Sequence, residues 1–191
     1  MLERIEKNFT DSIQCKIDHL ESDLLQNLNG AALLIVEGLL NEKKILVCGE
    51  SLAIYLSQML VHYLVVQYTF ERPSFPALSL SNHLLFNYEH IDIYEKQIHV
   101  LANEGDILIV FSVLDHSEIL HNAILSAIDK GMRIILFVQN NSILINLLNS
   151  KTDIVVKVDE KKTLPSLYEM YLLCIHSLCD VIDEYLFNIE E

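Results

Sequence analysis

After residue 43 the sequence alternates short apolar runs with stretches of helical period, and this alternation limits the fold more than any other feature. Strands that are apolar on both faces are typical of a parallel sheet with helices on both sides. The runs that predict strands are Lys44–Cys48, Phe75–Leu80, Ile107–Ser112, Arg133–Val138 and Ile154–Val158. The stretches between them predict helices near 52–68, 91–102, 117–130 and 142–149, and a last helix from after Pro165 to about Phe187. The sequence therefore predicts one α/β domain.

The first forty residues carry no strand pattern and predict helices. Apolar side chains recur there at helical spacing and form one stripe: Ile5, Phe9, Ile13, Ile17, Leu20, Leu24 and Leu28. Asn29 and Gly30 are typical of a helix end, so we expect a second, more deeply buried helix after them. We expect residues 1–42 to form a helical extension that joins an oligomer core, and residues 43–191 to form the α/β domain.

Composition excludes several classes of function. The chain has 27 acidic and 13 basic residues and a formal net charge of −14, which argues against direct binding of nucleic acid. Its apolar runs are too short to cross a bilayer and its N-terminus lacks a signal-peptide block, so we expect a cytoplasmic protein. Hydrophobic residues make up 51% of the chain, which indicates that another subunit covers some apolar surface. The cysteines lack metal or redox spacing and are interpreted as core residues: Cys15, Cys48, Cys174 and Cys179.

The turn after the first predicted strand is the first candidate for a ligand site, because ligands of parallel sheets bind at the carboxyl ends of strands. A phosphate in such a turn is held by backbone N–H groups at a helix N-terminus. This turn offers the small residue Gly49, but then the carboxylate of Glu50 and an apolar helix front. It therefore has the shape of a phosphate loop without its usual chemistry.

Several collinear stretches carry a family resemblance over nearly the whole chain. They are ERIEKNFTDSIQ, GLLNEKKILVCG, ERPSFPALSL, EGDILIVFS and SLCDVIDEYLF, and the blocks ERPSFPA and LCDVID are the most specific. In these stretches the sequence resembles the sugar isomerase (SIS) domain family of the phosphoheptose isomerase type. Within that type it resembles the DiaA-like proteins, which associate with the replication initiator DnaA. The resemblance implies a three-layer αβα sandwich with a five-stranded parallel sheet, assembled as a homotetramer or a dimer of dimers.

The first phosphate turn departs from the family pattern. The family reads Gly-Asn-Gly-x-Ser, and the corresponding residues are Gly49, Glu50, Ser51, Leu52 and Ala53. Ala53 replaces the hydroxyl, and Glu50 places negative charge beside the position of a dianion. Two like charges ~4 Å apart cost about 4 kcal/mol at an effective dielectric of about 20, enough to abolish millimolar binding. We therefore expect a sugar phosphate to be excluded.

The second phosphate segment departs as well. The family pattern Ser-Thr/Ser-x-Gly-Asn-Ser corresponds to residues 112–117, where Val113 replaces the middle hydroxyl and Asp115 the glycine. We interpret Ser117 as the N-cap of the next helix and His116 as a solvated loop histidine. The resemblance thus implies two degenerate phosphate loops, whose residues are Gly49, Glu50, Ser51, Ala53, Ser112, Asp115 and Ser117.

The proton-transfer positions are also altered. Family members move protons with a histidine and a glutamate on the helix after the first strand, and some place zinc there. The corresponding residues are Met59 and Tyr63, which are not usual zinc ligands. The family's Gln-Glu-x-His pattern and later histidine on the final helix correspond to Tyr168, Glu169, Tyr171 and His176. Only Glu169 and His176 match, so we expect no metal, no cofactor and no catalytic residue. The positions taken as vestigial are Met59, Tyr63, Tyr168 and His176.

The end of the last predicted helix combines an apolar tip with acidic side chains. The predicted buried face consists of Leu178, Val181, Ile182, Tyr185 and Ile189. Leu186 lies at the edge of this face, and Phe187 about 100° further round is expected to be exposed. The acidic residues around the tip are Asp180, Asp183, Glu184, Glu190 and Glu191. Leu186 and Phe187 are therefore a candidate hot spot for a basic partner, with packing inside the tetramer as the alternative.

These departures predict a protein without isomerase activity. In the DiaA-like group the region of Leu186 and Phe187 is linked to contact with the initiator. The resemblance then implies a non-catalytic scaffold that binds DnaA and regulates the initiation of chromosome replication. Two alternatives remain: a divergent phosphoheptose isomerase acting on sedoheptulose 7-phosphate, and a regulator that binds a sugar phosphate without turnover. The repaired site of the isomerase would use Ser51, Ser112, Ser117, Glu169 and His176.

Overall fold

The computed structural model describes residues 1–80, 91–158 and 163–187. Two N-terminal helices precede an alternation of strands and helices. The helices are α1 (Leu2–Leu20), α2 (Leu24–Leu40), α3 (Ala53–Val65), α4 (Ile93–Leu101), α5 (Glu118–Asp129) and α6 (Leu164–Phe187), with the 3₁₀ helix η1 (Ile143–Leu147). The strands are β1 (Ile45–Gly49), β2 (Ala77–Ser79), β3 (Ile107–Phe111), β4 (Arg133–Val138) and β5 (Ile154–Lys157).

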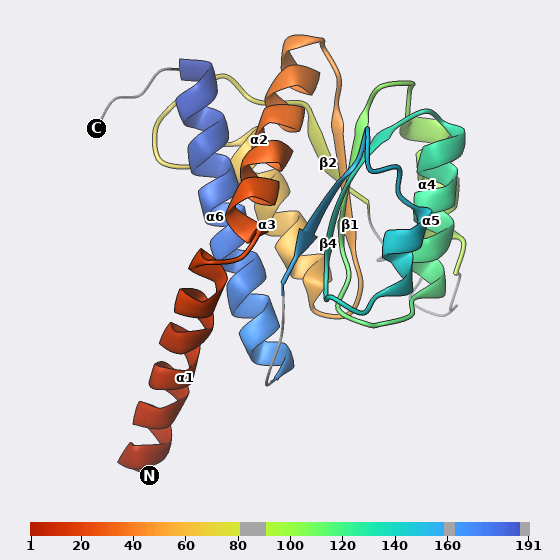
Figure 1. Cartoon of the computed structure of the whole chain (residues 1–191). Coiled ribbons are helices and arrows are strands. Elements are labelled where there is room, and N and C mark those ends of the chain that lie inside the picture. The colour runs from red at the N-terminus through yellow and green to blue at the C-terminus, as the bar shows by residue number, and fades with distance from the viewer. Residues whose placement is uncertain (81–90, 159–162, 188–191) are drawn as a thin grey trace.

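The strands form one parallel sheet in the order β2-β1-β3-β4-β5. Helices α4 and α5 cover one face of the sheet, and α2, α3 and α6 cover the other (Figure 1). The predicted three-layer αβα fold is thus confirmed. In this strand order the chain changes direction between β1 and β3, and the crevice at their carboxyl ends is where such sheets bind ligands.

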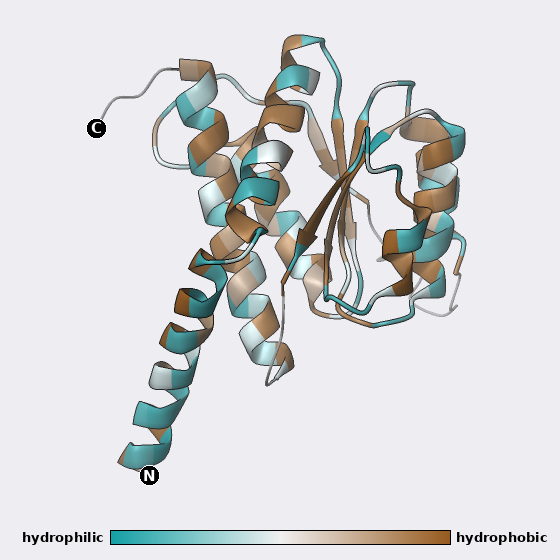
Figure 2. Ribbon diagram, in the orientation of Figure 1, coloured by the Kyte–Doolittle hydropathy of each residue, from teal (hydrophilic) through white to brown (hydrophobic). Residues whose placement is uncertain are grey.

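Strict alternation along the strands builds two cores. In β1, Ile45 and Val47 face the core under α2, α3 and α6, while Leu46 and Cys48 face the core under α4 and α5. Both sets are fully buried, which explains why the sequence shows continuous apolar runs rather than an apolar and polar alternation. The strands are accordingly brown in the hydropathy view (Figure 2).

Three predicted boundaries are wrong, two of them for a clear local reason. The N-terminal helices part at residues 21–23 rather than at Asn29 and Gly30, because the Ser22 hydroxyl accepts a hydrogen bond from the Leu24 amide and starts α2 there. Strand β2 begins only at Ala77, since Pro76 has no N–H to donate to the sheet. The predicted helix at 142–149 is the shorter η1.

Helix α1 projects away from the domain (Figure 1). Its predicted stripe exists, but the α1 part is open to solvent: the side chains at least half exposed are Leu2, Ile5, Phe9, Ile13, Ile17 and Leu20. Leu24 and Leu28, beyond the break, are buried in the domain. In the ranges that the structure describes, no helix combines the length and hydropathy needed to span a membrane.

The cysteines behave largely as predicted. Cys48, Cys174 and Cys179 are buried free thiols, and Cys15 on α1 is half-buried. Burial raises the pKa of Cys174 to about 12 and, with smaller contributions from nearby charges, the pKa of Cys179 to about 12. These two thiols are therefore protonated core residues at neutral pH.

Candidate functional site

The two predicted phosphate loops lie side by side at the carboxyl ends of β1 and β3. Strand pairing continues past Gly49, because the Glu50 amide donates to the Phe111 carbonyl at 3.4 Å. The turn after β1 is tight: a Cβ at Gly49 would come within 2.7 Å of the Ala53 carbonyl oxygen. Only glycine fits there, so this part of the loop retains the form that the sequence predicted.

The Glu50 side chain crosses from the first loop to the second. Its Oε1 accepts hydrogen bonds from the Ser112 hydroxyl at 3.0 Å, the Val113 amide at 2.9 Å and the Leu114 amide at 3.0 Å. We call these three donors the anion cradle. Glu50 is only 7% exposed. The expectation that Glu50 merely adds charge beside the anion position is therefore incomplete, because its carboxylate occupies the donors itself.

The start of α3 directs its amides inward to the turn. The amides of Ala53, Ile54 and Tyr55 donate to the carbonyls of residues 50, 51 and 52 respectively. Ala53 is fully buried, while Ser51 is exposed and adopts a left-handed φ of 52°. The first loop thus contributes Glu50 to the cradle and uses these three amides for its own turn.

The predicted residues of the second loop have different surroundings. Ser117 has extended backbone and its hydroxyl accepts from the Leu120 amide at 3.5 Å, so the predicted N-cap is confirmed. Asp115 and His116 are exposed. Ser112 is buried, and its single hydroxyl proton is shared between Glu50 Oε1 at 3.0 Å and the Leu114 carbonyl at 3.2 Å. Of the predicted hydroxyls, Ser112 alone belongs to the anion cradle.

Tyr63 on α3 and His176 on α6 come together across the helix interface. The Tyr63 hydroxyl lies 3.4 Å from His176 Nε2, and both side chains are half-buried. The ring of Tyr68 lies 5.2 Å from Tyr63 and 6.0 Å from His176 between centroids. A phenol and an imidazole are side chains of the kinds that act as general acid and general base, and here they come together between α3 and α6. The prediction treated both positions as vestigial, because spacing along the chain could not show that they meet.

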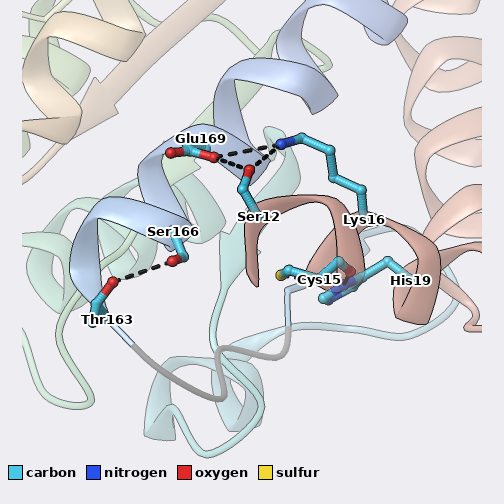
Figure 3. Close-up of polar contacts among 7 residues, drawn as sticks. All are labelled: Ser12, Cys15, Lys16, His19, Thr163, Ser166 and Glu169. Carbon is cyan, nitrogen blue, oxygen red and sulfur yellow. Dashed lines mark hydrogen bonds and ion pairs between the residues drawn. The ribbon is translucent and has the colours of Figure 1, made fainter. Parts of the chain in front are cut away.

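The other predicted positions on α6 have structural contacts. The Tyr171 hydroxyl is buried and donates to the Ser112 carbonyl at 2.6 Å, which fixes α6 against the cradle loop. Tyr168 packs on the core. Glu169 lies two turns before His176 and bonds instead to α1: its Oε2 accepts from the Ser12 hydroxyl at 2.5 Å, with Lys16 3.4 Å away (Figure 3). The Ser12 hydrogen bond, with Lys16 adding to it, lowers the pKa of Glu169.

The residues present do not fit a zinc site of the family type. Met59 and Tyr63 replace two of its ligands, and Glu169 and His176 are separated by about 10 Å along the helix axis. No group of three or more histidine, cysteine, aspartate or glutamate side chains gathers within the described ranges. We derive no chemical step through a metal.

The C-terminal tip of α6 differs from the prediction at Tyr185, whereas Phe187 is exposed as expected. Tyr185, expected to be buried, is 46% exposed, and its hydroxyl donates to the Asn29 side chain. Phe187 is 37% exposed, but its ring stacks on Phe75 and meets Phe70 edge-on. Leu186 packs against the core from the edge, as expected. The predicted residues Ile189, Glu190 and Glu191 lie outside the described residues.

Asp183 does not belong to an acidic rim, because it is buried and paired with Arg72. Arg72 Nε lies 2.7 Å from Asp183 Oδ1, with the two side chains 1% and 2% exposed. The Arg72 guanidinium also donates to the carbonyls of Tyr63 and Leu64 and lies 3.9 Å over the ring of Phe75. Burial raises the pKa of Asp183, and Arg72 opposes the rise. The two most specific sequence blocks, ERPSFPA and LCDVID, are therefore joined by one ion pair.

Comparison with known proteins decides the family. The family model described as SIS domain matches residues 8–138. This chain belongs to the SIS-domain family. A curated relative from Shewanella denitrificans, named phosphoheptose isomerase, is 36% identical over the full length of both chains. The structure of a phosphoheptose isomerase from Francisella tularensis superimposes with a TM-score of 0.88 at 31% identity, covering 96% of this chain and 98% of that one.

These relatives overturn the expectation of a protein that is not an enzyme. Three full-length relatives at 35–36% identity carry the name phosphoheptose isomerase, which is an enzyme. The missing family side chains therefore do not justify a non-catalytic assignment. A more distant likeness is the HobA–DnaA (domain I–II) complex from Helicobacter pylori, at a TM-score of 0.62 and 12% identity, covering 100% of this chain and 94% of that chain. At that identity the likeness shows the fold alone.

Proposed function

We propose that this protein is a sugar-phosphate isomerase of the phosphoheptose type, which interconverts an aldose and a ketose by moving a proton between adjacent carbons. The observation that carries the proposal is the contact of Tyr63 with His176, at two positions that correspond to the family's proton-transfer residues. The full-length relatives named phosphoheptose isomerase support the same reaction class. Sedoheptulose 7-phosphate is the substrate to test first.

The chemistry needs one base and one acid. Neutral His176 removes the proton from the carbon beside the sugar's carbonyl group, while Tyr63 donates its proton to the carbonyl oxygen, giving an enediol. His176 then returns its proton to the former carbonyl carbon, and the other enediol hydroxyl returns a proton to Tyr63. Both side chains end in their starting state, and no external oxidant or metal is needed for the proton balance.

Arg72 positions this pair rather than reacting. Its guanidinium donates to the Tyr63 carbonyl at 2.7 Å and is held by buried Asp183, which fixes the end of α3 against α6. Along α6, His176 lies about 7.5 Å beyond Tyr171, the residue that contacts the anion cradle loop.

The test is turnover of sedoheptulose 7-phosphate by the purified protein. Tyr63→Phe and His176→Ala are each expected to lower kcat at least about 100-fold, because each removes one proton-transfer group. Tyr185→Phe is the matched control, since Tyr185 lies nine residues beyond His176 on α6 and its hydroxyl donates to the Asn29 side chain. Absence of turnover by the wild-type protein, or full activity of both variants, contradicts the proposal.

The assembly is proposed to be a homotetramer, a dimer of dimers, in which the exposed face of α1 packs on other copies. Six apolar side chains on one exposed helix are more than a soluble monomer normally presents. Figure 2 shows brown segments along the otherwise mostly teal ribbon of α1. Of residues 1–42, which were expected to join an oligomer core, α1 then does so, while α2 packs in the core of the domain.

A second candidate function, binding of the initiator DnaA, is favoured by the C-terminal tip. Phe187 is an exposed aromatic side chain on a base formed by Phe70 and Phe75, a common arrangement for an interface anchor. Phe187→Ala is expected to weaken capture of the host's DnaA by at least tenfold while the oligomer persists. Leu173→Ala is the control, because Leu173 is similarly exposed on α6 but far along the helix from the tip. Equal capture by both variants excludes this surface.

A further inference from the structure

The anion cradle is occupied by a side chain of the protein itself. One carboxylate oxygen of Glu50 satisfies three donors within 3.0 Å, two of them backbone amides of the loop after β3. Consecutive amides that converge on one point are the arrangement by which loops bind phosphate oxygens. The carboxylate therefore takes the place that an anionic ligand takes at the switch point of such a sheet.

We propose that Glu50 is a built-in competitor of the substrate's phosphate, which must displace the Glu50 carboxylate from the anion cradle before it can bind. Coulomb repulsion makes simultaneous occupation unfavourable, because a dianion and a carboxylate would share three donors at hydrogen-bonding distance. Glu50 thereby weakens the binding of every anion at the cradle by the same factor, so at low concentration only an anion that gains further contacts elsewhere binds. The proposal rests on the proposed function only for the identity of the ligand as a sugar phosphate.

Local geometry permits this exchange. Glu50 lies in the turn between Gly49 and the left-handed Ser51, outside both β1 and α3, so its side chain can rotate outward without unravelling either element. Ser51 and Leu52 beside it are exposed, which leaves solvent next to the turn to receive the charged group. The donors Val113 and Leu114 stay fixed, because the preceding Ser112 carbonyl is held by Tyr171.

The first experiment measures binding of inorganic phosphate and of sedoheptulose 7-phosphate by calorimetry. Glu50→Ala is expected to bind both at least tenfold more tightly than the wild-type protein, because it vacates the donors and removes the repulsion. Glu50→Gln keeps the size of the side chain without its charge, so a smaller gain of about threefold to tenfold is expected. Glu118→Ala is the matched control, since Glu118 is an exposed carboxylate in the first turn of α5, whereas the cradle donors bond to Glu50. Its affinity is expected to equal that of the wild type.

A second measurement covers the case in which Glu50→Ala folds poorly. Without the carboxylate the cradle donors lose their acceptor, so Glu50→Ala is expected to melt lower in phosphate-free buffer and to recover when phosphate is added. Phosphate at about ten times its dissociation constant is expected to raise the Tm of this variant by about 3–6 °C and to leave the wild type almost unchanged. Glu50→Gln provides the same comparison with a milder loss.

The outcomes separate this inference from the proposed function. Phosphate affinities of Glu50→Ala and Glu50→Gln within twofold of the wild type overturn the inference, as does a bound sugar phosphate with Glu50 still in the cradle. Tighter phosphate binding by the variants, with no isomerisation by any form of the protein, supports the inference and rejects the isomerase proposal. Unphosphorylated sedoheptulose, run in parallel, is expected to show no gain in either variant.

Discussion

The anion cradle and helix α1 differ in whether their binding groups find partners within the chain. At the cradle a buried carboxylate meets three donors, so the chain satisfies its own polar groups internally. Along α1 six apolar side chains stay at least half exposed within the described part of the chain. Binding of an anion at the cradle therefore requires that an internal contact be broken. Association through α1 requires only a new contact with another molecule.

The largest expected effect comes from placing charge on α1. Phe9→Glu combined with Ile13→Glu is expected to convert the oligomer to monomers at micromolar concentration, because two buried carboxylates would oppose association. Light scattering with size-exclusion chromatography measures the mass. Lys7→Glu together with Glu6→Lys keeps the charge and alters other positions of the helix, so this control is expected to stay assembled. An intact oligomer in the Phe9 and Ile13 double variant removes α1 as the interface.

Arg72→Ala tests a strong internal contact, the buried ion pair with Asp183. The substitution leaves Asp183 buried without its partner and frees the carbonyls of Tyr63 and Leu64, so a loss of about 3–5 kcal/mol in unfolding free energy is expected. Urea denaturation measures this loss of unfolding free energy. Arg133→Ala breaks the exposed pair with Glu37 and is expected to cost about 1 kcal/mol or less. Adding Asp183→Asn to Arg72→Ala should recover part of the loss; equal costs for the two arginine variants would contradict this assignment.

The smallest expected effect concerns the contact of α1 with the domain, where Glu169 of α6 meets Ser12 and Lys16 of α1 (Figure 3). The pKa of Glu169 is lowered in the folded protein, so its contribution is present above the ordinary carboxyl pKa and disappears as the pH falls through the folded value. Glu169→Gln is expected to cost less than about 1 kcal/mol at pH 7, because the side chain is half exposed. Denaturation measured from pH 7 to pH 3 should show the two proteins converge. A constant difference at all pH values, or the same loss in Glu184→Gln, would refute the link.

Much of the fold followed from local patterns. The strands were recognisable because each is buried on both faces, and the Ser117 cap was recognisable because a hydroxyl before an acidic helix start satisfies a free amide. Gly49 was identifiable because the turn after β1 admits no Cβ. The break between α1 and α2 was misplaced, since Gly30 remains inside α2 and packs near Ile154, a contact that no local pattern reveals.

The sequence by itself determined the alternation of strands and helices, the order of the candidate loops and the apolar stripe of α1. Tertiary structure alone decided that the Glu50 carboxylate enters the opposite loop, that Asp183 turns inward to Arg72, and that Tyr63 meets His176. The physical reason is the separation along the sequence of the residues that interact. Burial and capping depend on neighbours a few residues away, whereas the direction of a charged or aromatic side chain depends on partners that only packing brings near.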